Sequence, residues 1–220
     1  MAQQRGLLYP ISGRIGDKIY CIRNGVSYIR NLPKKTTKAP TEKQLIHRAK
    51  FSLVMGFLFP IISILNESYR RINPKKSGTR MAVNQIFQEA LIGEYPNLEI
   101  DFCKVKLIRG SLRWPSGKMT YVAGANELDF NWSFEPMYDG TANDKLLVLI
   151  YSSLQNEFWY NLDVGVYRDQ EFCTIPVPLN FIGHEIHVWL GYQSPNGRSF
   201  SDSVYMGKTQ TQKCDDHEDF

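Results

Sequence analysis

Cationic side chains near the start of the chain are the residues best suited to binding chemistry. Lys and Arg alternate there with two tyrosines, Tyr20 and Tyr28. Lys and Arg pair with phosphate groups and aromatic rings stack on bases, so the pattern is typical of a surface that binds a polyanion or another charged partner. The candidate binding residues are Arg14, Lys18, Arg23, Arg30, Lys34, Lys35 and Lys38.

The charge of the chain is divided unevenly. Residues 1–80 hold 16 Lys and Arg against three acidic residues, a net charge of +13, and residues 81–220 hold 10 against 19, a net charge of −9. Such a basic segment could face phosphates, an acidic partner or the acidic part of the same chain. No named nucleic-acid-binding motif accompanies it. We therefore expect a protein partner or self-association, with nucleic acid as the alternative.

Residues that could carry catalysis or hold a metal ion have unsuitable spacings. Segment 207–209 ends like a phosphate-binding loop, but Asp202 stands where that loop needs glycine. His184 and His187 are three residues apart, so they would point to opposite faces of a strand. The sequence predicts no enzyme, no catalytic residue, no cofactor and no metal site.

The elements that must position the basic residues begin with a β-hairpin. Asn24-Gly25 separates two β-prone runs, 16–23 and 26–30, and Asn-Gly favours the turn of a two-residue hairpin. A basic linker bounded by prolines, 33–40, follows the hairpin.

Two helical segments are expected after this linker. Thr41 opens a capping-box pattern, Pro60 predicts a break near 56–60, and a second piece should run to about Tyr69. Another helix is expected over 79–92, with Gly93 as its stop. The run 51–65 carries no charge but is short for a membrane span, so we expect a buried core helix and no membrane span.

From Ile100 onward the apolar residues alternate, as in strands. The predicted strands are 101–109, 118–123, 127–134, 145–152, 159–168, 171–177, 184–193 and 199–206. The predicted fold class is α+β, with a β-hairpin and a two-helix segment followed by an antiparallel β-sandwich. The predicted parts are a basic hairpin and helical region over 1–97, the sandwich over 98–208, and a disordered acidic tail over 209–220.

Part of this sandwich resembles a known fold. The run LDFNW at 128–132 and the later segment 187–203 look like parts of a fibronectin-type or immunoglobulin-like sandwich, over about residues 101–207. The chain has no Cys-Trp-Cys trio, which disfavours the immunoglobulin domains that a disulfide holds together.

A second resemblance covers nearly the whole chain. The segments that carry it are SGRIG at 12–16, RNG at 23–25, YIR at 28–30, PKK at 33–35, PTEKQL at 40–45, RAKF at 48–51 and SDS at 201–203. Their order is similar to a family of uncharacterised, domain-of-unknown-function proteins common in Bacteroidota. The resemblance supports the fold and implies no activity.

The expected function is non-enzymatic binding or assembly through protein-protein contacts, as a subunit of a larger complex such as a secretion machine or a phage particle. The alternative is binding of nucleic acid or another polyanion through the basic N-terminal third. Four cysteines at no disulfide-framework spacing, and no evident signal peptide, make the cytoplasm the default location.

Overall fold

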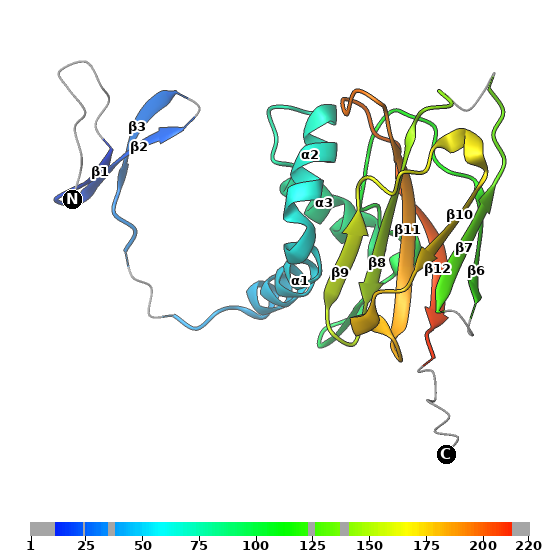
Figure 1. Cartoon of the computed structure of the whole chain (residues 1–220). Helices are drawn as coiled ribbons and strands as arrows, with labels where there is room; N and C mark the ends of the chain where they lie inside the picture. The colour runs from blue at the N-terminus through cyan, green and yellow to red at the C-terminus, as the bar shows by residue number, and fades with distance from the viewer. Residues whose placement is uncertain (1–11, 24, 35–37, 123–125, 137–140, 213–220) are drawn as a thin grey trace. The chain divides into compact units, whose positions relative to one another are not determined.

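The computed structural model describes residues 12–23, 25–34, 38–122, 126–136 and 141–212, without the side chain of Arg70. The chain divides into two compact units, Met1–Thr41 and Glu42–Phe220. Figure 1 labels most of the strands and helices of the two units.

The N-terminal unit is a three-stranded antiparallel sheet in the order β1-β2-β3. Its strands are β1, Gly13–Ile15; β2, Lys18–Arg23; and β3, Val26–Asn31. Gly16 lies in the β1–β2 turn with a φ of +60°, a left-handed conformation that favours glycine. β2 and β3 pair along their whole length, which confirms the predicted hairpin, although Asn24 lies outside the described residues. The sequence did not predict β1.

Three helices open the larger unit: α1, Glu42–Leu58; α2, Ile62–Ile72; and α3, Gly78–Gln85. α1 begins one residue after Thr41, as predicted. A 3₁₀ turn over Phe59–Ile61 separates α1 from α2 and contains Pro60. Because proline has no N–H to donate, it ends the α-helical bonding there, and the predicted break is confirmed.

The prediction of one helix over 79–92 is wrong at its C-terminal end. After α3 a π-helical turn covers Ile86–Ala90, and the chain then forms a hairpin of β4, Leu91–Glu94, and β5, Asn97–Ile100. Gly93 is a residue of β4 with a φ of +79° and lies against the backbone of Asn97. It therefore serves the hairpin and does not stop a helix.

The helical run Glu42–Tyr69 is the one stretch among the described residues that is long and apolar enough to cross a membrane, by length and composition. A third of its most apolar window, 33%, is buried inside the fold. The side chains of this run that lie in the hydrophobic core are Val54, Phe57, Leu58, Ile61, Ile64, Leu65 and Tyr69.

Two antiparallel sheets follow the β4–β5 hairpin, and neither is closed into a barrel. One has the order β10-β7-β6, from β6, Gly117–Val122; β7, Glu127–Trp132; and β10, Phe172–Pro176. The other has the order β12-β11-β8-β9, from β8, Lys145–Ser152; β9, Glu157–Asn161; β11, Glu185–Gln193; and β12, Val204–Gln210. The helices are thus segregated from mostly antiparallel sheets, as in the α+β class.

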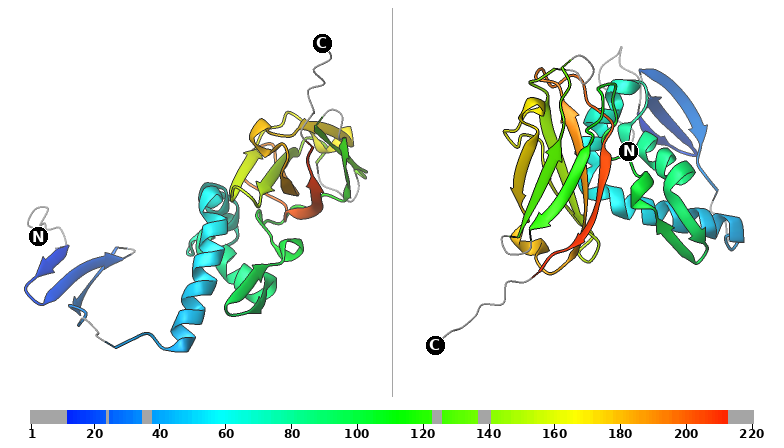
Figure 2. Two further views of the ribbon diagram at one scale, coloured as in Figure 1. Left: turned by 90° about the horizontal axis from the view of Figure 1, so that it is seen from below. Right: turned by 90° about the vertical axis from the view of Figure 1, so that its right-hand side faces the viewer.

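Alternate side chains of β8 enter two different cores. Leu147 and Leu149 pack with the helices, whereas Val148 and Ile150 pack with the β10-β7-β6 sheet. Successive residues of a strand point to opposite faces, so β8 is buried on both sides. Figures 1 and 2 show the resulting layers: the helices cover one face of the four-stranded sheet and the three-stranded sheet covers the other.

The predicted strand over 101–109 is wrong. The segment forms a 3₁₀ turn over Phe102–Lys104 and then runs without a named strand to β6. Its burial is nevertheless real, because Val105, Leu107 and Ile108 belong to the core beneath the helices. Apolar residues in an irregular segment gave a strand-like pattern.

The Ser-Asp-Ser run at 201–203 holds this irregular segment in place. The Ser203 hydroxyl accepts hydrogen bonds from the backbone N–H groups of Leu107 (2.9 Å) and Ile108 (3.2 Å). The Asp202 carboxylate accepts from the Gly110 N–H (3.1 Å) and pairs with Lys106 (2.8 Å). The backbone groups that a ladder would have satisfied are therefore satisfied by side chains.

Most other strand predictions are confirmed within a few residues. Two boundaries differ more: the prediction 159–168 corresponds to β9 over Glu157–Asn161, and 199–206 corresponds to β12 over Val204–Gln210. Segment 162–167 contains Gly165 at a φ of +76°, so the chain leaves the sheet before it. Thr211, just after β12, is buried and bonds to the backbone of Phe181.

Candidate functional site

The register of the N-terminal sheet sorts its side chains into two faces. Arg14 and Arg30 both pair opposite Ile19, which places these three residues on one face. Lys18 pairs opposite Ile15 and Asn31, which places those three on the other face. Directly paired residues of an antiparallel sheet share a face and successive residues alternate, so every other position follows.

The first face carries all three arginines of the sheet, and we call it the arginine face. Its members are Arg14, Ile19, Cys21, Arg23, Val26, Tyr28 and Arg30. The three arginines and Tyr28 are exposed. Asp17 in the β1–β2 turn is the one acidic residue of segment 1–41, and among the described residues of this unit none of the three arginines forms an ion pair with it.

Strand geometry gives the spacing of these arginines. Arg14 and Arg30 lie two strands apart, and neighbouring strands are about 4.8 Å apart, so their backbones are about 10 Å apart. Arg23 pairs opposite Val26, four residues along β3 from Arg30, which is about 14 Å. Tyr28 lies between Val26 and Arg30 on the same strand. The arginine face therefore places an exposed aromatic ring on β3 beside the line that joins Arg23 and Arg30.

The second face is mostly apolar, and we call it the apolar face. Its members are Ile15, Lys18, Tyr20, Ile22, Ser27, Ile29 and Asn31. Three isoleucines on it are exposed, from 43% for Ile22 to 59% for Ile29. Its one charged side chain, Lys18, donates a hydrogen bond to Asn31 on the same face.

The predicted binding residues do not form one surface. Arg14, Arg23 and Arg30 share the arginine face, whereas Lys18 lies on the apolar face. Lys34 and Lys38 are exposed in the linker that follows β3, and Lys35 lies outside the described residues. The sequence-based prediction treated all of these cations as one surface, so it showed neither the two faces nor the apolar character of the second one. The alternation of residues on either side of Asn24-Gly25 carried the signal that could have shown both.

No described residue of the N-terminal unit is buried. An isolated two-stranded hairpin is marginally stable at best in water, and a third strand or packing of its apolar face adds stability. Contiguous exposed apolar side chains of this kind mark interaction surfaces. The sheet therefore has one exposed, mostly apolar face and one exposed face with three arginines.

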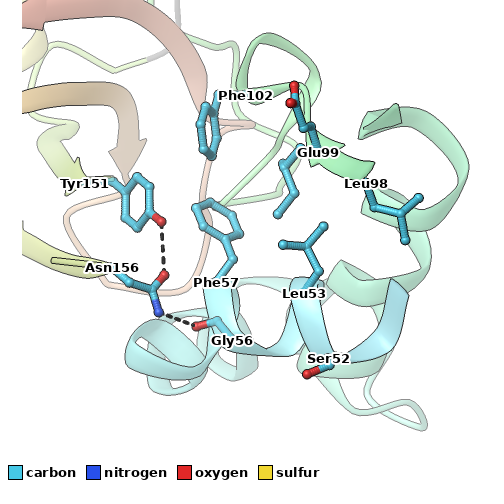
Figure 3. A pocket seen from close by; sticks show the side chains of 10 residues that line it. Ser52, Leu53, Gly56, Phe57, Leu98, Glu99, Phe102, Tyr151 and Asn156 are labelled. Atoms are coloured by element: carbon cyan, nitrogen blue, oxygen red, sulfur yellow. Dashed lines mark hydrogen bonds between the residues drawn. The ribbon is translucent and has the colours of Figure 1, made fainter. Parts of the chain in front are cut away.

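The larger unit has a separate, shallow apolar pocket of about 490 Å³ (Figure 3). It lies between α1, the β4–β5 hairpin and the β8–β9 turn. Leu53 and Phe57 of α1, Leu98 of β5 and the Phe102 ring supply apolar wall. At one side the Tyr151 hydroxyl donates to the Asn156 side-chain oxygen (3.0 Å).

The lining of this pocket is mostly apolar, and its few polar groups are not arranged for catalysis. Asn156 also donates to the Gly56 carbonyl (3.4 Å), so its amide is engaged on both sides. Burial raises the pKa of Tyr151, which keeps its phenol neutral. Glu99 is the one carboxylate in the lining, and it is exposed. An apolar ring or chain is the chemistry that such a wall would accept.

The histidines that the sequence singled out lie in different hydrogen-bonded sites. His187 on β11 contacts the Tyr205 hydroxyl through Nδ1 (2.8 Å), and the His184 Nδ1 contacts the Ser152 hydroxyl (3.0 Å). Burial lowers the pKa of His187 and raises that of Tyr205 to about 12. In the described part of the chain, no three His, Cys, Asp or Glu side chains gather where they could hold a metal ion.

The chain matches a known protein family. A family model described as "Family of unknown function (DUF6266)" matches residues 10–207, which include the N-terminal sheet, the helices and most of both larger sheets. No curated protein matches the chain.

Proposed function

Since the chain belongs to the DUF6266 family, whose function is unknown, we propose its function from the surfaces that it exposes. The proposal is a non-enzymatic assembly protein that acts through protein-protein contacts, as a subunit of a larger complex such as a secretion machine or a phage particle. Its N-terminal sheet docks through the apolar face against a second copy of the chain. One observation carries the proposal: this sheet exposes apolar side chains and buries none of its described residues.

The distribution of charge favours a second copy as the partner. Two arginine faces brought together would place like charges in contact, which is destabilising. Two apolar faces would bring together isoleucines and one lysine each, and that lysine already has a partner in its own sheet. A two-fold contact of identical surfaces is the commonest form of self-association.

The expected association is weak. The isoleucines of the apolar face are already about half covered, so further burial adds only about 1 kcal/mol per side chain. Association costs about 4–15 kcal/mol in lost freedom of motion. We therefore expect a dissociation constant in roughly the micromolar to millimolar range, unless a larger complex adds contacts.

Sedimentation of the full chain over a wide concentration range tests the proposal. Reversible self-association that persists at high salt is expected, because salt weakens charge contacts and not apolar ones. Ile22→Asp and Ile29→Asp should abolish it, whereas Leu154→Asp should not, because Leu154 is an exposed apolar residue of the larger unit. A monomer at all concentrations, or equal loss in all three variants, contradicts the proposal. Co-purification of the monomer with a different protein would replace the second copy by that partner.

The second candidate function is binding of nucleic acid or another polyanion. The specific observation in its favour is that three arginines share one exposed face without a carboxylate on it. A mobility shift with DNA or RNA that weakens with salt tests it, because each phosphate contact releases counterions.

We also infer that the two larger sheets form an immunoglobulin-like sandwich. The strand orders β10-β7-β6 and β12-β11-β8-β9 support this inference. They differ from the constant-type immunoglobulin order, ABED against CFG, in one respect: the fourth strand, β9, pairs beside the third and not beside the fifth. An experimental structure tests the assignment through the hand of the connections between the two sheets.

The cytoplasm is the proposed location, and it stays a prediction, as does the occurrence in Bacteroidota. Cys21, Cys103 and Cys173 are free thiols, which suits a reducing compartment. Fractionation of cells that produce the native chain tests it.

A further inference from the structure

We propose that the arginine face binds single-stranded nucleic acid, with phosphates at Arg14, Arg23 and Arg30 and a base stacked on Tyr28. This inference deepens the second candidate function and rests on it, and it is independent of the docking of the apolar face. The proposed ligand class is single-stranded nucleic acid, and Tyr28 is the residue expected to distinguish it from other polyanions.

The arrangement of charge and ring supports this ligand. Sites for single strands combine a cationic surface that follows the backbone with aromatic side chains on which bases stack. The arginine face has both, because Tyr28 lies directly between Val26 and Arg30 on β3 and pairs opposite Cys21. Tyr28 is 43% exposed, so part of its ring is open to a ligand.

The spacing of the three arginines fits an extended backbone. Their backbones lie about 10–14 Å apart, and each side chain is long enough to shorten or lengthen that spacing by several ångströms. A flexible strand with a phosphate at every nucleotide can place separate phosphates at all three. Arg14 donates from Nε to the Gly16 carbonyl (2.9 Å), which holds its stem against the β1–β2 turn.

The arginines on this face favour anions in general, and Tyr28 is the side chain that distinguishes a single strand from a duplex. Arginine stays charged at all relevant pH values and binds phosphate oxygens through a planar fork. In a duplex the faces of each base are covered by the base pairs stacked above and below it, so a ring on a sheet can stack only on unpaired bases. We therefore expect Tyr28 to contribute to binding of single strands and not of duplexes or heparin.

Fluorescence anisotropy with the full chain and a labelled oligothymidine of 12 nucleotides tests the inference. The variant R14Q/R23Q/R30Q should lose at least tenfold in affinity. The control K75Q/K76Q/R80Q removes three exposed charges from the larger unit and should lose less than twofold. For wild type, the plot of log K against log salt should have a slope of about −2, because each of three phosphates adds about −0.7.

Two further variants keep the test decisive if the glutamine variant fails to fold. R14K/R23K/R30K retains all charges and should retain most of the affinity and the salt slope. Tyr28→Leu should weaken oligothymidine binding about tenfold, within the range measured for stacked bases, while Tyr160→Leu on β9 should not. Neither Tyr28→Leu nor Tyr160→Leu should change binding of duplex DNA or heparin.

The outcomes separate the two proposals. Equal affinity for heparin, duplex and single strand, with no effect of Tyr28→Leu, overturns the single-strand inference and leaves general polyanion binding. Equal losses in the arginine variant and its charge-matched control overturn the assignment to this face. Absence of binding to every polyanion overturns the second candidate function as well. Self-association is then judged by sedimentation alone.

Discussion

Arg168 and Asp144 form an ion pair that is almost completely removed from water. The guanidinium Nη2 lies 3.2 Å from the carboxylate Oδ2, and neither side chain is more than 3% exposed. The guanidinium also lies 4.0 Å from the centre of the Tyr192 ring and donates to the Arg113 carbonyl (2.9 Å). The other carboxylate oxygen of Asp144, Oδ1, accepts a hydrogen bond from the Thr141 hydroxyl (2.6 Å). This pair links the loop before β8 to the loop before β10.

Arg168→Met should therefore lower the free energy of unfolding by about 3–5 kcal/mol, because it leaves a buried carboxylate without its counter-ion. Urea denaturation measures the change. The double variant R168M/D144L should lose less than R168M alone, since it removes both charges. Arg198→Met, at an exposed position, is the control and should change stability by less than about 0.5 kcal/mol. A loss in R168M no larger than this would show that the pair is not important for stability.

Ser203→Ala should destabilise the larger unit by about 2–4 kcal/mol. The substitution leaves the backbone N–H groups of Leu107 and Ile108 without an acceptor, and each buried unsatisfied group costs about 1–3 kcal/mol. Thermal or urea unfolding gives the value. Ser116→Ala removes a hydroxyl from an exposed position and should be nearly neutral. Equal effects of the two substitutions would contradict the role given to Ser203.

His187 should make the stability depend on pH. Its burial lowers its pKa below the usual 6.5, and the effect of nearby Lys208 adds to this while Glu185 opposes it. The Phe102, Tyr151 and Trp189 rings and the Tyr205 hydroxyl also lie close to its ring. Below pH 6.5 the unfolded chain then binds more protons than the folded one, so stability falls as the pH falls from about 7 to 5.5.

Denaturation at several pH values measures this dependence. His187→Gln cannot titrate and should flatten the curve between pH 7 and 5.5, whatever its effect on absolute stability. Parallel curves for wild type and His187→Gln would refute the assignment.

Brief treatment with trypsin should cut first between the two units. Lys34 and Lys38 are exposed and lie outside any strand or helix, so the backbone there can enter a protease site. Mass spectrometry should detect a resistant fragment that begins at residue 35, 36 or 39. The fragment should keep the melting temperature of the intact chain, because the linker lies outside both hydrophobic cores. First cleavage within 42–212 would contradict this expectation.

Local signals in the sequence predicted several elements well. Asn-Gly at 24–25 fixed the β2–β3 hairpin, Pro60 fixed the break between α1 and α2, and the alternation around Phe130 fixed β7. In each case a property of the residue itself, such as a turn preference or a missing N–H, decides the structure.

Other elements depend on distant partners and escaped prediction. Segment 101–109 has a strand-like pattern, but its Leu107 and Ile108 N–H groups bond to the side chain of Ser203, nearly a hundred residues later. The β4–β5 hairpin follows directly from a helix-forming run, so helical periodicity extended too far. The two faces of the N-terminal sheet were hidden because cations were counted along the chain and not by strand register. The sequence thus pointed to a set of candidate cations, whose role stays a prediction, but not to their division between the two faces of the sheet.

Because β8 is buried on both faces, the helices and both larger sheets should unfold as one cooperative unit. Leu147 and Leu149 are covered by helices from earlier in the chain, and Val148 and Ile150 by strands on the opposite side. A chain trimmed to start at β6 would expose the first pair to water, together with Trp189. Loosening either layer therefore weakens the other, and the two should melt in a single transition.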